Sequence, residues 1–526
     1  MLSRASPGVA AAGASPALDT LTAEQLRILA YASALGAEFD FDLLVAAMGL
    51  PEEELAEQLE RLVHVGVLRE RVGGGRFGFE EEEFRARVYR SLTESRLRVL
   101  HRKIADVMET TYPDPPAEVL AELGRHYFLG KVPDKSAFYN RRAAEVARAA
   151  DQPEVAVHHL ERVLVDLQAL GTPQTKAEAE VAESLGDLYY GLGNFRAADR
   201  YYTDALARAD SGDPHMHARL LLARAEVARE NLDADAAVNG AAQALRLFAK
   251  AEDQIGIAQT YRLLGRVAFQ RGAYRDALDQ SMRALDALPP RSDAPLLGRL
   301  SIDIGNSFAL LGPEVRVEAI EWYERAVERL RQSGDWPELS RAYHNLGVTV
   351  GETSPRDGLE YLEQARDAAE RAHDARAVGR SLLSGVELRI ALGELEEAER
   401  DNEQAGRILE RLGDALSLQS VAVNRGLIAE KQAQWEEAER AFLDSLTLAR
   451  KYQLTADEAE VQFYLARLRF KTRNLEGARA AFRSATELKV TELRPQHASQ
   501  YEDLKRQLAE AEQAAAATSD AASHPL

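Results

Sequence analysis

Cysteine is absent from this 526-residue sequence, which excludes disulfide bonds and thiolate metal or redox sites. No apolar run approaches the ~20 residues needed to span a bilayer. The phosphate-binding G-x-x-x-x-G-K-[ST] loop, a His-Glu-x-x-His pair and a nucleophile elbow are also missing. With 65 Lys and Arg against 85 Asp and Glu, the net charge of −20 repels nucleic acid and anionic lipid on average. We therefore expect a cytoplasmic, non-enzymatic protein with no cofactor or metal and no nucleic-acid or membrane partner.

Residues 1–18 also lack the long apolar core of a signal peptide. They are rich in Ala, Ser, Gly and Pro and contain one Arg. This composition predicts a disordered tail.

What the sequence does contain is a repeat, which is clearest over Ala179–Ala209. Small residues such as Gly186 and Ala198 fall where two helices must touch, and large residues such as Tyr189 and Tyr202 stand beside them. This spacing resembles the tetratricopeptide repeat, a helix, a tight turn and a second helix. One such unit cannot bury its apolar face alone, so it requires copies on either side.

Two series of small residues recur along the chain at the same step of about 40 residues. The series of the first helices is Gly186, Ala225, Gly265, Gly305, Gly347, Val386, Gly426 and Ala466. The series of the second helices is Ala198, Ala237, Ala277, Ala319, Gly358, Ala398, Ala438 and Ala478. Because both series keep the same step, they predict one continuous array of helical hairpins.

A different pattern precedes the repeats. We expect helices over residues 20–35, 42–48 and from 52, strands near 65–68 and 76–79, and one long helix over 82–108. Three helices followed by a β-hairpin is the order of a winged helix. The third helix, however, carries five glutamates and one arginine over residues 52–61, which opposes contact with DNA phosphates. We expect a structural or interaction role for this domain.

Three segments carry a second resemblance. They are ALGAEFDFDLLVAAMGLPEEELAEQLERLVHVGVLRE, FRARVYRSLTESRLRVLHRKIADVMET and AELGRHYFLGKVPDKSAFYNRRAAEVARAAD. They resemble the winged-helix arm that follows the nucleotide-binding core in STAND-type ATPases and large LuxR-type regulators. In that family the arm runs directly into repeat helices. The chain departs from the family in having no ATPase core and in having Glu80–Glu83 after the return strand. The resemblance therefore implies architecture without ATPase activity.

The predicted fold class is all-α, a tetratricopeptide-like right-handed superhelix of helical hairpins with an N-terminal winged-helix domain. A final helix with Tyr501, Leu504 and Leu508 on one face is expected to cap the array. The expected parts are a tail (1–18), a winged-helix-like domain (19–112), irregular helical pairs (113–175), repeats (176–490), and a capping helix with a polar tail (491–526).

Candidate binding residues lie on the first helices of the later repeats, which line the concave side in tetratricopeptide proteins. The resemblance implies that asparagines at matching positions hold a peptide backbone or carboxylate, since an amide both donates and accepts hydrogen bonds. Nearby arginines add positive charge. The candidate set is Asn306, Asn345, Arg380, Asn424, Arg299 and Arg341. The competing interpretation is that these amides pack helices together and that the arginines are only solvated.

The sequence therefore predicts a scaffold that binds a peptide or protein segment of unknown identity in the groove of the repeats. The alternative is a sensor or regulatory subunit of a split STAND-like signalling or transcription-control system.

Overall fold

The computed structural model describes residues 18–71, 73–171, 175–210, 212–289, 292–493 and 497–523. The expected tail, apart from Leu18, and the last three residues lie outside this range. The chain forms two compact units, Met1–Gly256 and Ile257–Leu526. Residues Leu18–Thr20 form a 3₁₀ turn at the start of the first unit.

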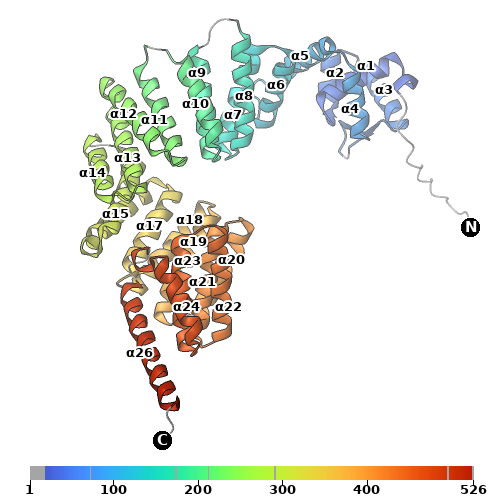
Figure 1. Ribbon diagram of the computed structural model, residues 1–526. Coiled ribbons are helices and arrows are strands. Elements are labelled where there is room, and N and C mark those ends of the chain that lie inside the picture. The colour runs from blue at the N-terminus through green and yellow to red at the C-terminus, as the bar shows by residue number, and fades with distance from the viewer. Residues whose placement is uncertain are drawn as a thin grey trace, which may run out of the picture. The chain divides into compact units, whose positions relative to one another are not determined.

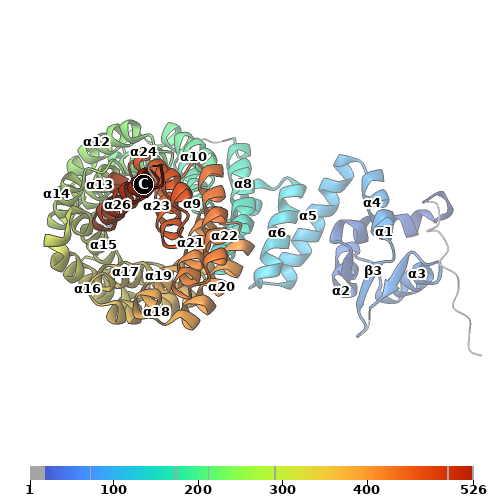
Figure 2. The same ribbon diagram turned by 60° about the horizontal axis from the view of Figure 1, so that its bottom comes forward.

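The first unit opens with helices and a small sheet. The elements are α1 (Ala23–Leu35), β1 (Glu38–Asp40), α2 (Phe41–Met48), α3 (Glu52–His64), β2 (Leu68–Glu70), β3 (Arg76–Phe79) and α4 (Glu82–Ser91). The three strands are antiparallel in the order β1-β3-β2 (Figure 2). The first three predicted helices and the hairpin are present, but the first hairpin strand begins at Leu68 and residues 65–67 form a turn. Strand β1 was not predicted, because three residues are too short a stretch for alternation to indicate a strand. The winged-helix assignment stays a prediction.

The single long helix expected over residues 82–108 is wrong. The structure divides it into α4 and α5 (Glu94–Thr111), because Leu92 has an extended backbone. Thr93 then caps α5, and its side chain accepts a hydrogen bond from the backbone N–H of Arg96 at 3.3 Å. This hydroxyl satisfies one of the unpaired donors of a new helix start.

A buried hydrogen-bonded chain joins α4 and α5 to α6 (Ala117–Gly130). The Tyr89 hydroxyl lies 2.8 Å from His101 Nε2, and His101 Nδ1 lies 2.8 Å from His126 Nδ1. On the far side, Arg125 Nη2 lies 2.9 Å from His126 Nε2. Both imidazoles are almost wholly buried. Burial lowers the pKa of His101 to about 3, and it also lowers the pKa of His126. This pair therefore stays neutral in the fold.

Helical pairs make up the rest of each unit (Figure 1). The first unit continues with α7 (Pro133–Ala149), α8 (Pro153–Ala169), α9 (Thr175–Gly191), α10 (Phe195–Arg208), α11 (Pro214–Glu230) and α12 (Ala234–Lys250). Helix α13 (Gln254–Gln270) begins at the division between the units. The second unit contains α14 (Tyr274–Ala287), α15 (Ala294–Leu311), a 3₁₀ turn (Pro313–Val315), α16 (Arg316–Ser333), α17 (Trp336–Gly351), α18 (Pro355–Arg371), α19 (Ala375–Leu392), α20 (Leu395–Arg411), α21 (Ala415–Lys431), α22 (Trp435–Lys451), α23 (Thr455–Lys471), α24 (Leu475–Glu487), α25 (Val490–Leu493) and α26 (Ala498–Ser523).

Small residues of the first series lie where the two helices of a pair meet. A Cβ atom placed on Gly186 would lie 2.4 Å from a ring carbon of Tyr202. The same test gives 2.6 Å between Gly305 and Tyr323 and 2.5 Å between Gly426 and Phe442. These contacts confirm tetratricopeptide-like hairpins in both units.

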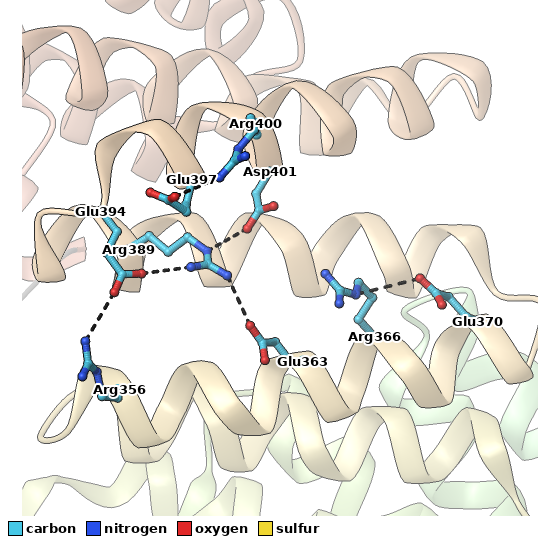
Figure 3. Close-up of polar contacts among 9 residues, drawn as sticks. All are labelled: Arg356, Glu363, Arg366, Glu370, Arg389, Glu394, Glu397, Arg400 and Asp401. Carbon is cyan, nitrogen blue, oxygen red and sulfur yellow. Dashed lines mark hydrogen bonds and ion pairs between the residues drawn. The ribbon is translucent and has the colours of Figure 1, made fainter.

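The second helices are joined to the first helices by charged contacts as well. Arg389 of α19 is largely buried and donates to Glu394 (2.9 Å), Asp401 of α20 (2.8 Å) and Glu363 of α18 (3.2 Å) (Figure 3). Burial alone would lower the pKa of Arg389, but the three carboxylates outweigh it and raise that pKa. The guanidinium thus links three consecutive helices.

The variant Arg389→Met should lower the free energy of unfolding by about 1–3 kcal/mol, because hydrogen bonds to a charged group are lost and three carboxylates lose a shared cation. Arg400→Met is the matched control, since Arg400 is 71% exposed and pairs with Glu397 on the surface. This control should change stability by less than about 0.5 kcal/mol. Equal shifts of the urea midpoint for both variants would rule out a structural role for Arg389.

Acid should loosen the α5–α6 junction. The pKa values of His101 and His126 are lower in the fold than in an unfolded chain, so their contribution to stability is complete above about pH 6.5 and decreases toward pH 3. Hydrogen exchange of α5 and α6, corrected for its intrinsic pH dependence, should therefore rise between pH 6.5 and 4. Unchanged protection of both helices between pH 6.5 and 4 would contradict a stabilising role of the buried histidine pair.

Candidate functional site

The first helices of the second unit form one side of successive helical pairs. Helix α15 contacts α17, α17 contacts α19, and α19 contacts α21. Residues six before, two before and one after the small residue of each first helix share one side of that helix, because they differ by about 3 or 4 positions. We call the surface that these positions form on α15, α17, α19, α21 and α23 the first-helix face.

Two predicted asparagines meet on this face. Asn345 Nδ2 donates to Asn306 Oδ1 at 2.7 Å, and the Tyr323 hydroxyl donates to the same oxygen at 2.8 Å. Both amides are half-buried. We call these three residues the amide cluster. The hydrogen bonds inside the cluster use Oδ1 of Asn306 and Nδ2 of Asn345. Within the described residues, Nδ2 of Asn306 and Oδ1 of Asn345 have no hydrogen bond.

The three predicted arginines differ in their partners. Arg299 donates to Asp335 at 3.1 Å, and Asp335 also caps α17. Arg341 lies 2.7 Å from Glu338 on its own helix. Arg380 is exposed and makes no ion pair within the part of the chain that the structure describes.

Arg380 and Arg341 both lie close enough to the amide cluster to affect its neighbours electrostatically. Burial, with the charge of Arg380, lowers the pKa of His344 to about 4. With this pKa, His344 is neutral at pH 7. It directly precedes Asn345 in the sequence. Burial raises the pKa of Tyr323, while the charge of Arg341 opposes this effect. Arg341 lies on the same helix as Asn345, and Arg380 lies on α19, which contacts that helix.

Asn424 lies elsewhere on the face. It is only 2% exposed, and its Nδ2 donates to the backbone oxygen of Leu383 at 3.5 Å. It lines a separate cavity of about 480 Å³, which we call the α21 cavity. The lining residues are Glu387, Ile390, Gln419, Ser420, Val423, Asn424, Leu427, Asp457, Glu460, Tyr464 and His497.

The wall of the α21 cavity contains a hydrogen-bonded triplet that the sequence did not reveal. Glu460 Oε1 accepts from the Tyr464 hydroxyl at 3.0 Å and lies 2.6 Å from His497 Nε2. Burial and the charge of the carboxylate raise the pKa of Tyr464. The repeat pattern could have pointed to Glu460, because Glu460 stands at the same position in its helix as Arg380. Nothing in the repeat pattern locates His497, which lies beyond it.

No group of three or more His, Asp or Glu in the part of the chain that the structure describes is arranged to hold a metal ion. No helix there is long and apolar enough to cross a membrane.

No protein-family model matches the chain, and a search of curated proteins finds no match. Among solved structures, the chain is similar to a STAND protein with a tetratricopeptide repeat sensor from Pyrococcus horikoshii. The two are 14% identical, the alignment covers 84% of this chain and 66% of that one, and the TM-score is 0.49. The chain is also similar to RapI in its apo form, with 13% identity, 68% of this chain and 98% of RapI covered, and a TM-score of 0.51.

The RapI similarity supports the fold. Together with the helical pairs and the glycine–aromatic contacts within them, it shows that this chain is a tetratricopeptide-type repeat protein.

Substitution of Asn306 should destabilise the fold, whereas substitution of Arg380 should not. Asn306→Ala should lower the free energy of unfolding by about 1–3 kcal/mol, because the Tyr323 hydroxyl and the Asn345 amide lose a shared, half-buried acceptor. Arg380→Ala should change it by less than about 0.5 kcal/mol, since this exposed side chain has no partner within the described residues to lose. Chemical denaturation of the two variants measures both values. A large loss for Arg380→Ala would show that Arg380 is structural.

Proposed function

We propose that the first-helix face of the second unit binds a peptide or an extended protein segment. The observation that carries this proposal is the amide cluster, with the exposed Arg380 on the neighbouring first helix α19. Nδ2 of Asn306 and Oδ1 of Asn345 offer one donor and one acceptor, which is the pair that a peptide unit requires. The bonds inside the cluster hold these groups in place before any ligand arrives, which reduces the entropy lost on binding.

Arg380 supplies the charge for this surface. Its guanidinium presents several donors in a plane, which suits a carboxylate of the bound segment. His344 is neutral and adds no charge of its own to this surface. The proposed role is equilibrium binding without catalysis, and the partner is a protein or peptide.

A protein partner also fits the surface of the N-terminal helices better than a nucleic acid does. The glutamates of α3 at positions 52, 53, 54, 57 and 60 are all exposed. A groove-binding helix with this charge would be repelled by phosphates and would release no counterions. The proposal therefore gives α3 no role in reading DNA.

Peptides selected from a random-sequence phage library on the full chain test the proposed function. Arg380→Glu should weaken the selected peptides about tenfold or more, since a lost hydrogen bond to a charged group costs about 1.5–3 kcal/mol. Asn345→Ala should weaken them about two- to tenfold, since a lost neutral hydrogen bond costs about 0.5–1.5 kcal/mol. Arg400→Glu on α20 is the control, because it makes the same charge change on an exposed residue of a second helix. Fluorescence anisotropy gives the three dissociation constants. Unchanged affinity for both first-helix variants, or an equal loss for the control, would refute binding on this face.

A further inference from the structure

The second unit contains a groove on a side of α21 that differs from the first-helix face. The groove is lined by α20, α21 and the start of α22 and has a volume of about 670 Å³. We call it the outer groove. None of its lining residues lines the α21 cavity. Leu418, Val421 and Ile428 of α21 give it an apolar floor, and four glutamates and two arginines also line it.

The preceding repeat has the same groove in a closed form. This groove is lined by α18, α19 and α20, and its volume is only about 10 Å³. Arg366 of α18 and Arg389 of α19 line it. Arg389 donates to Glu363 on one wall and to Asp401 on the other (Figure 3). A guanidinium of the chain itself therefore fills the space between the two walls.

Small residues replace both arginines in the outer groove. Ala429 stands 40 positions after Arg389, and Gly406 stands 40 positions after Arg366. Both small residues line the outer groove. The following repeat again has an arginine, Arg469, 40 positions after Ala429. The outer groove is thus open because it lacks an arginine that the repeats on both sides have.

The carboxylates that pair with these arginines are retained in the outer groove. Glu403 stands 40 positions after Glu363, which accepts from the arginine of the preceding repeat. Glu399 stands 40 positions before Glu439, which accepts from the arginine of the following repeat. Glu399 is exposed and makes no hydrogen bond or ion pair within the described residues. The outer groove therefore keeps both carboxylate positions without the cation.

Asn402 adds an independent indication of the ligand. Its side chain lines the outer groove and is only 5% exposed. Its Nδ2 donates to the backbone oxygen of Val421 at 3.0 Å, whereas its Oδ1 has no hydrogen-bond partner within the described residues. A buried acceptor without a donor is rare in folded proteins. A guanidinium offers several N–H groups and would satisfy this oxygen together with the carboxylates.

Two arginines line the outer groove without filling it. Arg407 lies 3.5 Å from Glu403 on the same helix, and both side chains are exposed. Arg425 is exposed and makes no ion pair within the part of the chain that the structure describes. Against the four glutamates, these two cations leave the groove with a net negative charge.

The first unit shows that an arginine at the position of Arg425 leaves such a groove open. Arg224, which like Arg425 directly precedes the small residue of its first helix, donates to Asp199 at 2.8 Å. The groove that these two residues line still has a volume of about 740 Å³, and Ala228 stands there at the position of Ala429. Closure therefore depends on the residue at the position of Ala429 and not on Arg425.

We propose that the outer groove accepts an arginine side chain of a partner protein. The guanidinium takes the place that Arg389 occupies in the preceding repeat, and it donates to Glu399 and Glu403. Its planar set of donors suits two carboxylates and an amide oxygen better than the compact ammonium of a lysine does. Its methylene stem packs on the apolar floor. This surface is separate from the first-helix face and adds a second binding site to the proposed function.

Peptides from a random-sequence phage library test this inference. They are selected on the full chain and depleted on Ala429→Arg, which supplies the missing guanidinium from α21 itself. The remaining peptides should carry a recurrent arginine and should bind this variant about tenfold more weakly than the wild type. Replacing that arginine by glutamine should weaken binding to a similar extent, since hydrogen bonds to a charged group are lost. Fluorescence anisotropy gives the dissociation constants. Selected peptides without a recurrent arginine would overturn the inference.

Two further variants keep the test independent of the folding of Ala429→Arg. Glu399→Gln changes one exposed side chain and should weaken the selected peptides about three- to tenfold. It replaces Ala429→Arg in the depletion if thermal unfolding shows that Ala429→Arg is not folded. Ala228→Arg is the matched control, because it makes the same substitution in the groove of the first unit, and it should leave the affinity unchanged. An equal loss for this control, or unchanged affinity for Glu399→Gln, would contradict an arginine site in the outer groove.

A second copy of this chain is the other candidate occupant of the outer groove. Sedimentation velocity distinguishes it, and the proposal expects the same sedimentation for the wild type and for Ala429→Arg. A wild-type dimer that Ala429→Arg converts to a monomer would assign the groove to self-association and overturn the proposal of a different partner.

Discussion

The close approach of two helices at a glycine is the contact on which the rest of the structure depends. In three pairs, a Cβ atom on Gly186, Gly305 or Gly426 would lie within 2.6 Å of an aromatic ring carbon of the second helix. Glycine inside a helix costs up to about 1 kcal/mol relative to alanine. That cost is offset by burial of a large ring, since Tyr202, Tyr323 and Phe442 are each at least 97% buried. Each pair is thereby held at a fixed separation.

This contact also decides which side chains of a first helix remain available to a ligand. The Tyr202 hydroxyl donates to Asp187 and the Tyr323 hydroxyl donates to Asn306, so the residue after the glycine is engaged in both pairs. Phe442 has no hydroxyl, and the residue after Gly426 is the apolar Leu427. Within the described residues, the side chains six before and two before the glycine make no such hydrogen bond to the aromatic residue of these two pairs. In the proposed site Asn306 therefore offers a ligand only its Nδ2.

The repeats could be predicted from sequence because their signal is local. Small and large residues at fixed spacing set each hairpin, and the structure confirms hairpins of this kind. The break at Leu92 and Thr93 escaped prediction because an apolar helical pattern continues across it. The contact between Asn306 and Asn345 could not be derived, since it joins side chains 39 positions apart whose rotamers depend on packing. The contact of His497 with α23 could not be predicted either, because no repeat pattern places the C-terminal segment against that helix.

Helix α19 shows how one helix serves both stability and recognition. Arg380 and Arg389 are nine residues apart, and at about 100° per residue they point to opposite sides of the helix. Arg389 therefore reaches the carboxylates of α18 and α20, where its largely buried guanidinium is paired (Figure 3). Glu387, seven residues from Arg380, returns to the side of Arg380 and faces the α21 cavity. In a chain with 20 more acidic than basic residues, an exposed arginine without an ion pair in the described residues depends on such a separation of faces. The helical period thus keeps Arg380 and Glu387 apart from the charges that join α19 to its neighbours.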